Sequence, residues 1–311
     1  MKILFMGTPD FAVGIAEAIY ESSHEIVAVV TQPDRPKGRS GASVASPVKE
    51  FALSHDIPVL QPSAVKKPEE VEKLKNIDAD ICVVAAFGQI LSKEILDIWP
   101  NGCINVHASL LPEYRGAAPI QWAIADGRQT TGVTVQQMNE GVDTGDIISS
   151  VAVNIDSNET GGSLFDKLAK AGAGLIVETL DLIAQGRAIR TPQDESAATY
   201  AKMLKKEMGC IDFTQSAQRN ERLVRAFSPW PGSYTYLDGR LLKIKKCTAV
   251  PEGGHAEPGT ITKVTKDELF IECGKGTLIV TAVQPEGKRE MPVHDLLLGR
   301  KIEEGTVLGR H

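Results

Sequence analysis

Two polar side chains close a short apolar run, and they are the first indication of chemistry in this sequence. The run CINV at residues 103–106 predicts a buried strand, and Asn105 and His107 lie two positions apart at its end. Because strand side chains alternate with a period of two, the amide and the imidazole should share one face. Ligands of open α/β sheets bind outside the carboxyl ends of the strands. A satisfied polar residue at a strand end would explain either residue alone, but the pair favours a site.

A carboxylate in a later loop completes a set of groups that suits acyl transfer. Asp143 lies in the polar sequence NEGVDTGD at residues 139–146, whose two glycines permit tight turns. When negative charge develops on a carbonyl oxygen, Asn105 can donate a hydrogen bond, and Asp143 can orient His107 and favour its protonated form. Ser109 raises the alternative of a Ser-His-Asp hydrolase. No G-x-S-x-G elbow surrounds it, which disfavours that alternative.

Length and composition predict a two-domain protein of the cytoplasm. The chain has 311 residues, of which 42% are hydrophobic, so a substantial core is available. Its five cysteines are an odd number without a C-x-x-C pair, which indicates reduced thiols and neither a disulfide framework nor a zinc site. The apolar start is too short for a signal peptide, and no run approaches the roughly 20 apolar residues of a membrane span. We therefore expect no membrane association.

The first part of the chain follows an α/β rhythm. All-apolar runs at residues 2–6, 26–30 and 81–85 predict buried strands, and segments of helical periodicity lie between them. The turn after the first strand lacks the G-x-G-x-x-G that close approach to a pyrophosphate requires, which excludes NAD and flavin cofactors. An apolar loop at residues 87–91 follows the third run. Its free backbone groups could hold a flat heterocycle, beside Asn105 if the two strands are neighbours.

A long segment at residues 32–47 predicts an irregular loop with two possible roles. It contains three prolines, two glycines and the cations Arg35, Lys37 and Arg39. Loops of this length are usually either functional or disordered. Both a flexible surface insertion and a binding loop remain open on these residues alone.

The chain then divides into three parts. We expect a catalytic domain over residues 1–189, a polar linker over residues 190–205 and a second domain over residues 206–311, where one helix precedes five short strands. Such strands predict a small OB-like barrel. Residues 1–205 carry a net charge of −8 and residues 206–311 one of +2. This asymmetry fits either a polyanion-binding domain or ordinary surface composition.

Several motifs resemble the folate-dependent formyltransferase family. INVHASLLPEYRGAAPIQWAI and GVTVQQMNEGVDTGDI carry the resemblance over roughly residues 1–190. MGTPDFA, TQPDRPKGR and FSPWPGSY are similar to the members that act on methionyl-tRNA, and they extend it over nearly the whole chain. The resemblance implies a Rossmann-like parallel-sheet domain that binds 10-formyltetrahydrofolate, followed by an OB-like β-barrel domain that helps to hold initiator methionyl-tRNA. It also implies a monomeric enzyme of translation initiation that uses no metal.

The resemblance assigns roles to residues as well. The methionyl α-amine would attack the formyl carbon directly, with Asn105, His107 and Asp143 as the catalytic residues. The formylfolate would contact the apolar loop at residues 87–91, the central loop at residues 108–116 and the loop of Asp143: Phe87, Gly88, Gln89, Ile90, Leu91, Ser109, Leu110, Leu111, Pro112, Gly141 and Val142. The tRNA would contact six cations: Arg35, Lys37, Arg39, Lys243, Lys245 and Lys246.

One departure and two alternatives qualify this hypothesis. The loop reads GRSGASVASP where many relatives carry further cations after the Gly-Arg, so its hold on tRNA is open. A family member that formylates an amino sugar, or that hydrolyses the formylfolate, would keep Asn105, His107 and Asp143 but should lack TQPDRPKGR. A catalytically inert tRNA-binding protein would keep the basic second domain and lose those three residues.

We expect Arg39→Ala to reduce formylation of initiator methionyl-tRNA more than that of elongator methionyl-tRNA. The reason is that a planar guanidinium can read a base edge or stack in an opened stem, whereas a phosphate contact would weaken all tRNAs alike. In the phosphate case, the slope of log affinity against log salt would flatten by about one unit. Initiator and elongator kcat/KM values at several salt concentrations distinguish the two. Unchanged KM, kcat and tRNA preference would show that residues 32–47 are a surface insertion without a role in tRNA binding.

Overall fold

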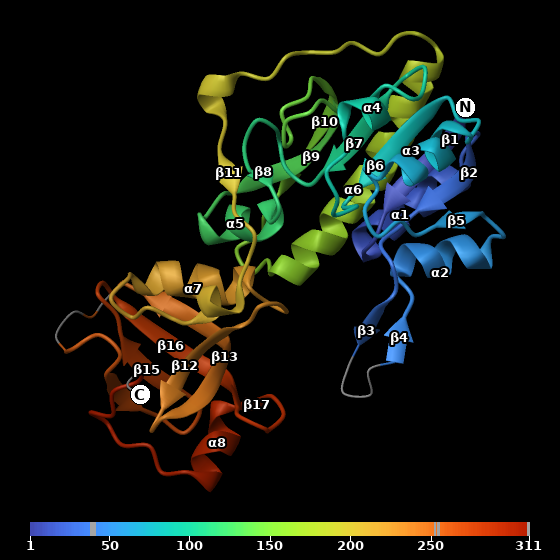
Figure 1. Cartoon of the computed structure of the whole chain (residues 1–311). Coiled ribbons are helices and arrows are strands. Elements are labelled where there is room, and N and C mark those ends of the chain that lie inside the picture. Colours follow the sequence, from blue (N-terminus) through green and yellow to red (C-terminus); the bar gives the residue numbers. More distant parts are fainter. Residues whose placement is uncertain (38–41, 252, 254–255, 310–311) are drawn as a thin grey trace. The chain divides into compact units, whose positions relative to one another are not determined.

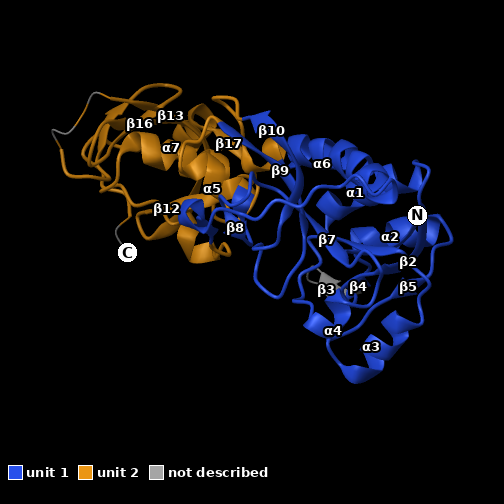
Figure 2. Cartoon of the chain, turned by 90° about the horizontal axis from the view of Figure 1, so that it is seen from above, with its two compact units in different colours: residues 1–119, 130–154, 165–201 blue, residues 120–129, 155–164, 202–311 orange. Residues whose placement is uncertain are grey.

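The computed structural model describes residues 1–37, 42–251, 253 and 256–309 of the chain. These residues form two compact units, which Figure 2 shows in different colours. Unit 1 consists of residues 1–119, 130–154 and 165–201. Unit 2 consists of residues 120–129 and 155–164 together with the chain from residue 202 onward. Two short insertions from the first two thirds of the sequence therefore belong to the second unit.

Unit 1 is built on a seven-stranded sheet with the order β10-β9-β7-β6-β1-β2-β5. Five neighbouring strands run parallel, and β9 and β10 are antiparallel additions at one edge. The hydrophobic runs of the sequence form the central strands β1, β2, β6 and β7, which are mostly buried between two helical layers, whereas the edge strands β5 and β10 are partly exposed. Their bounds are β1 Lys2–Gly7, β2 Glu25–Val30, β5 Val59–Leu60, β6 Ile81–Ala85, β7 Cys103–His107, β9 Thr130–Gln137 and β10 Ile147–Asn154.

Helices cover both faces of this sheet (Figures 1 and 2). One face packs against α1 and α6, where Gly172 lies against Val106 and Val133. The other face packs against α3 and α4 in a core that includes Leu74, Ile95 and Cys103. The helix bounds are α1 Asp10–Tyr20, α2 Pro47–Ser54, α3 Pro68–Lys75, α4 Lys93–Leu96, α5 Pro119–Ala125 and α6 Gly161–Ala184, of which α5 and the first turn of α6 lie mainly in unit 2.

The chain changes direction across the sheet between β1 and β6. From β1 it adds β2 and β5 on one side, and it then returns to add β6 and β7 on the other. At such a switch point the loops at the carboxyl ends diverge and leave room for a ligand. Here, the hydroxyl of Thr8 and the side-chain amide of Gln32 both donate to the carbonyl of Phe87, at 3.1 and 3.2 Å. These bonds tie the ends of β1, β2 and β6 together.

The segment predicted as an irregular loop after β2 is partly regular. Residues Arg35–Lys37 form β3 and Ala42–Val44 form β4, and the two pair antiparallel. The sequence pattern missed this ribbon because proline weakens a strand prediction, yet the fixed φ of proline is compatible with an edge strand. Arg39 lies outside the described residues.

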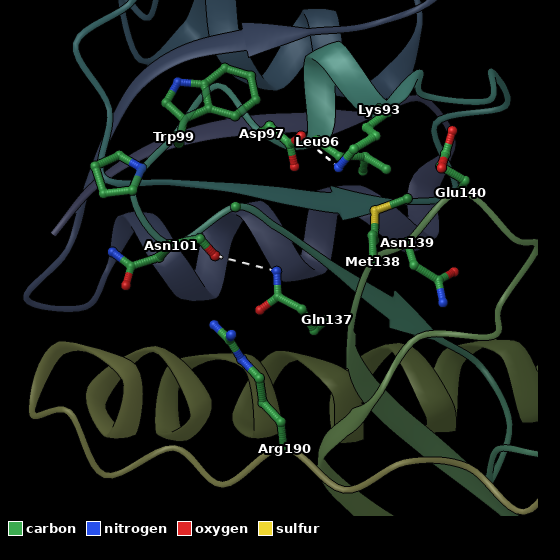
Figure 3. Close-up of a pocket in the computed structure, with 12 residues that line it drawn as sticks. Lys93, Leu96, Asp97, Trp99, Asn101, Gln137, Met138, Asn139, Glu140 and Arg190 are labelled. Atoms are coloured by element: carbon green, nitrogen blue, oxygen red, sulfur yellow. Dashed lines mark hydrogen bonds and ion pairs between the residues drawn. The ribbon is translucent and has the colours of Figure 1, made fainter.

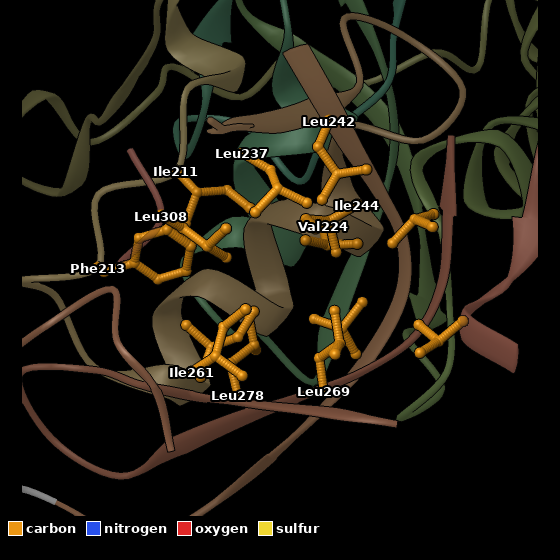
Figure 4. Close-up of a cluster of buried hydrophobic side chains, with 14 of the residues drawn as sticks. Ile211, Phe213, Val224, Leu237, Leu242, Ile244, Ile261, Leu269, Leu278 and Leu308 are labelled. Carbon is orange, nitrogen blue, oxygen red and sulfur yellow. The ribbon is translucent and has the colours of Figure 1, made fainter. Parts of the chain in front are cut away.

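Unit 2 contains a six-stranded antiparallel sheet with the order β12-β13-β16-β15-β14, and β17 also pairs with β16. Its inner face encloses a hydrophobic cluster that includes Ile244, Ile271 and Leu278 (Figure 4). Bulges beside Lys246 bend β13. The predicted fold class, a parallel-sheet α/β region followed by a small β region, is confirmed, while the OB-like label stays a prediction. The bounds are α7 Ala217–Ala226, β12 Ser233–Leu237, β13 Arg240–Val250, β14 Ile261–Val264, β15 Leu269–Glu272, β16 Thr277–Pro285, β17 Met291–Pro292 and α8 Val293–Gly299.

Two glycines of the first β-α unit give a matched stability test. A Cβ on Gly7 would lie 2.6 Å from the Cβ of Ala12 and 3.0 Å from the carbonyl oxygen of Ala85, so Gly7→Ala should destabilise by about 1 to 3 kcal/mol. Gly14 has nothing within 4 Å of its Cβ position, so Gly14→Ala should stabilise α1 by about 0.5 to 1 kcal/mol. Urea unfolding measures both. Equal effects of the two substitutions would contradict this packing account.

Candidate active site

The structure brings together the three polar residues that the sequence singled out. Asn105 and His107 leave β7 on the face that Cys103 shares, and both point to the carboxylate of Asp143. The amide nitrogen of Asn105 donates to Oδ1 of Asp143 at 3.4 Å, and Nδ1 of His107 lies 3.5 Å from the same oxygen. These separations are longer than a strong hydrogen bond, so a substrate oxygen can compete for either group.

The orientation of His107 follows from its second ring nitrogen. Nε2 lies 2.9 Å from the carbonyl oxygen of Tyr114. A carbonyl only accepts hydrogen bonds, so Nε2 carries a proton and Nδ1 is the nitrogen that faces Asp143. The imidazole is 7% exposed, so it is almost completely shielded from water. A second proton on His107 would therefore reside beside the carboxylate.

Asp143 is held by donors from several elements. Oδ2 accepts from the backbone N–H of Gly116 at 2.8 Å, and Oδ1 accepts from the side-chain amide of Gln136 at 2.9 Å. The carbonyl oxygen of that amide accepts from the N–H of Gly145 at 3.1 Å, which fixes its orientation. Asp143 itself has a φ of 54°, an uncommon conformation for a residue with a side chain. The sequence interpretation missed Gln136, because its place directly opposite Asn105 follows from the pairing of β9 with β7, which the sequence does not show.

Ser109 is engaged within the central loop. Its hydroxyl donates to the carbonyl of Glu113 at 2.6 Å, and its own carbonyl accepts from the hydroxyl of Thr134 at 2.7 Å. That threonine hydroxyl also accepts from the N–H of Leu111. Ser109 is fully buried and bonded away from His107. A Ser-His-Asp arrangement is therefore not formed, and the loop is instead a rigid support.

The residues predicted to contact formylfolate fall into two groups. Ile90 and Val142 are 61% and 55% exposed, and Gly88 and Gly141 are exposed beside them. The other residues lie inside or support the loops. Phe87, Leu91 and Leu111 are buried, Leu110 and Pro112 are half-buried, and the side chain of Gln89 bonds to the backbone of Val65 and Pro62.

Five of the six cations predicted to contact tRNA lie on two strands, and the sixth, Arg39, lies outside the described residues. Lys243 and Lys245 alternate along β13 with the buried Leu242 and Ile244, so both point away from the core of unit 2. Lys245 lies 3.4 Å from Glu290. Lys246 follows at the bulge and is exposed. Arg35 and Lys37 lie on β3 of unit 1.

A hollow of about 480 Å³ opens in unit 1 at the other end of β7 (Figure 3). It is bordered by Trp99, Gly102 and Gln137 and by Arg190, which points into it. Asn105, His107 and Asp143 are not among its lining residues, so it is separate from the convergent polar groups. Among the residues that the structure describes, no helix is long and apolar enough to cross a membrane.

The sequence matches family models along most of its length. Residues 1–180 match the formyl transferase family, and residues 203–301 match its C-terminal domain. The chain belongs to the formyl transferase family. Curated relatives are named methionyl-tRNA formyltransferase. That of Agathobacter rectalis is 50% identical over 306 residues, covering 98% of this chain and 99% of the relative, and that of Acetivibrio thermocellus is 46% identical over 311 residues, covering all of both.

Solved structures share the fold at much lower identity. The sugar 3N-formyl transferase WlaRD, solved in the presence of dTDP and 5-N-formyl-THF, superposes with a TM-score of 0.70 at 21% identity and covers 93% of this chain and 99% of its own. An N-formyltransferase from Helicobacter canadensis in complex with folinic acid and dTDP-3-aminofucose superposes with a TM-score of 0.69 at 18% identity, covering 94% of this chain and 100% of its own. These likenesses concern the fold.

We expect Asp143→Asn to lower turnover by about a hundredfold or more. The substitution replaces one carboxylate oxygen by an NH₂ group, which is a hydrogen-bond donor. In one orientation of the amide this group faces the N–H of Gly116, and in the other it faces the amide N–H groups of Gln136 and Asn105, so two donors are opposed in either case. The control Asp146→Asn removes a charge from the same loop and should leave kcat within about twofold. Single-turnover formyl transfer by both variants checks this, and equal rates for both would argue against a specific role of the Asp143 carboxylate.

Proposed function

We propose that this protein transfers the formyl group of 10-formyltetrahydrofolate to the α-amine of initiator methionyl-tRNA, and so prepares the tRNA for translation initiation. The observation that carries the proposal is the convergence of Asn105 and His107 on Asp143, at 3.4 and 3.5 Å. Full-length similarity to proteins named methionyl-tRNA formyltransferase supports the identity of the acceptor.

The three groups divide the chemistry of the transfer. The neutral α-amine adds to the formyl carbon, and negative charge develops on the formyl oxygen. The amide of Asn105 donates a hydrogen bond to that oxygen, and His107 protonated at Nδ1 adds a positive charge beside it. Asp143 stabilises that proton because its Oδ1 faces Nδ1. The tetrahedral intermediate then collapses: the bond between the formyl carbon and N10 of the folate breaks, and the proton that the amine loses passes to N10, supported by the pair of His107 and Asp143, so that tetrahydrofolate leaves. No covalent bond to the protein is required, since the amine is itself the nucleophile.

The formylfolate has a suitable surface on the loop that follows β6 and on the loop of Asp143 that joins β9 to β10. The exposed side chains of Ile90 and Val142 offer apolar contact to a flat heterocycle. Gly88, with a φ of 84°, leaves backbone groups open to it. Burial of Phe87 and Leu91 keeps the loop between them fixed, so their role is support of the backbone rather than direct side-chain contact.

The tRNA is assigned to charged groups on both units. Lys243, Lys245 and Lys246 present positive charge on β13, and the ribbon of β3 and β4 carries Arg35 and Lys37. We further propose a catalytic domain over residues 1–189 and a tRNA-binding domain over residues 206–311. The working protein is proposed to be a monomer of the cytoplasm, where aminoacylated tRNA and reduced folates are found together.

One assay tests the function directly. The protein is incubated with 10-formyltetrahydrofolate and charged initiator tRNA, and formylmethionine is measured against controls with uncharged initiator tRNA and charged elongator tRNA. Formylation confined to the charged initiator supports the proposal. Formylation of an aminosugar nucleotide, or release of formate without tRNA, would contradict it and favour the other members of the family.

We expect Asn105→Ala and His107→Ala to lower kcat by about 10² to 10³, because each removes one group that stabilises the developing oxyanion. Binding of 5-formyltetrahydrofolate, measured by fluorescence quenching, should change little, since the expected folate contacts lie on other loops. Asn101→Ala is a matched control in the turn that precedes the same strand. Near-wild-type turnover of either site variant would remove that residue from the mechanism.

A further inference from the structure

A segment that follows α6 returns to the catalytic loops of unit 1. Residues 191–201, which we call the strap, run back from the end of α6 to β8, and Figure 1 shows them as the yellow chain that reaches β11. Residues Tyr200–Ala201 form β11, which pairs parallel with β8, Arg115–Gly116. The N–H groups of Arg115 and Ala117 donate to the carbonyls of Thr199 and Ala201 at 2.9 and 3.0 Å. The strap is therefore hydrogen-bonded to the central loop.

Gln193 connects the strap to the loop of Asp143. Its Nε2 donates to the carbonyl oxygens of Asp143 and Gly145, at 3.0 and 2.6 Å. Its Oε1 accepts from Nε and Nη2 of Arg115, at 3.1 and 2.8 Å. A guanidinium only donates and a carbonyl only accepts, so all four contacts agree on one orientation of the amide. Gln193 thus joins the two loops that meet at the carboxylate of Asp143.

Arg115 makes this junction rigid. Its side chain is fully buried, and its guanidinium donates to both carboxylate oxygens of Glu195 at 2.7 and 2.8 Å as well as to Gln193. A buried guanidinium is tolerated when its donors are paired in this way. The hydrogen bond from Arg115 also holds the pKa of the Glu195 carboxyl below its usual range. The planar fork of Arg115 consequently fixes where the amide of Gln193 can stand.

We propose that Gln193 is a positioning residue for formyl transfer, which acts by holding the backbone of Asp143 in its uncommon conformation. The carboxylate of Asp143 can meet the N–H of Gly116, the amide of Asn105 and the imidazole of His107 together only while that backbone is fixed. Gln193 does this through carbonyl oxygens and touches no reacting atom. This inference rests on the proposed site of Asn105, His107 and Asp143.

Substitution of the amide separates positioning from simple support. Gln193→Glu keeps the size of the side chain and an acceptor for Arg115. It replaces the NH₂ group, which donates two hydrogen bonds, by an oxygen that faces the carbonyl oxygens of Asp143 and Gly145. Gln193→Met keeps the approximate size and removes the donors without adding charge. Ser196→Ala is the matched control, because that exposed hydroxyl donates to Asp194 within the strap itself.

We expect both Gln193 variants to lower kcat about ten- to a hundredfold, because misplacement of a catalytic group by about 1 Å can cost 10²-fold. The KM for initiator methionyl-tRNA and the Kd for 5-formyltetrahydrofolate should stay within about twofold of wild type, and Ser196→Ala should match wild type throughout. Steady-state kinetics, folate titration and thermal unfolding of the full chain measure these quantities.

Other outcomes overturn the inference. Unchanged kcat in Gln193→Glu and Gln193→Met would show that the loop of Asp143 keeps its place without the amide. A rise in KM for tRNA at constant kcat would make the strap a tRNA contact. A loss of activity that only follows loss of folded protein in both variants would make Gln193 a purely structural residue. Asn105→Ala and His107→Ala serve as references, since full activity of those variants would refute the site itself rather than the role of Gln193.

Discussion

The arrangement of the site depends on the hydrogen-bond donors that one partly buried carboxylate, that of Asp143, requires. Asp143 is 14% exposed, so water cannot satisfy its oxygens fully, and burial of an unpaired carboxylate is costly. Its partners come from the central loop at Gly116, from β9 at Gln136 and from β7 at Asn105. The position of each element is thereby constrained by the same group that faces His107. The same hydrogen-bond network around Asp143 therefore stabilises the loops and orients the carboxylate toward His107.

The parallel sheet supplies the frame in which this network can form. The β6 strand lies next to β7, so the apolar loop after β6 and the polar ends of β7 open on the same edge. Antiparallel addition of β9 then places Gln136 opposite Asn105. The strands β7 and β9 lie on the β6 side of the point between β1 and β6 where the chain reverses its direction across the sheet. Diverging loops at that point leave space for a ligand.

Local patterns in the sequence predicted individual strands and helices better than the tertiary contacts between them. All-apolar runs indicated β1 at Lys2–Gly7 and β6 at Ile81–Ala85, and alternation placed Asn105 and His107 on one face. The ribbon of β3 and β4, the short α4 and the return of the strap were not predicted. The strap is held by hydrogen bonds between segments that are distant in sequence. The other two elements consist of short stretches with prolines or polar residues, which give no periodic signal. Gln193 stands in such a polar stretch, and tertiary contacts alone reveal its role.

The strap also has a consequence for the order in which the protein is made. Asp143 is synthesised well before the residues that fix its backbone, because Gln193 and β11 emerge only after the whole of α6. Contacts between such distant segments form late, since the entropy of closing the intervening chain must be overcome first. A nascent chain that ends at α6 can complete the sheet but holds an unfinished catalytic loop. On the proposed role of Gln193, competence for chemistry arises only after residue 201 has left the ribosome, at a later stage than the fold that surrounds the site.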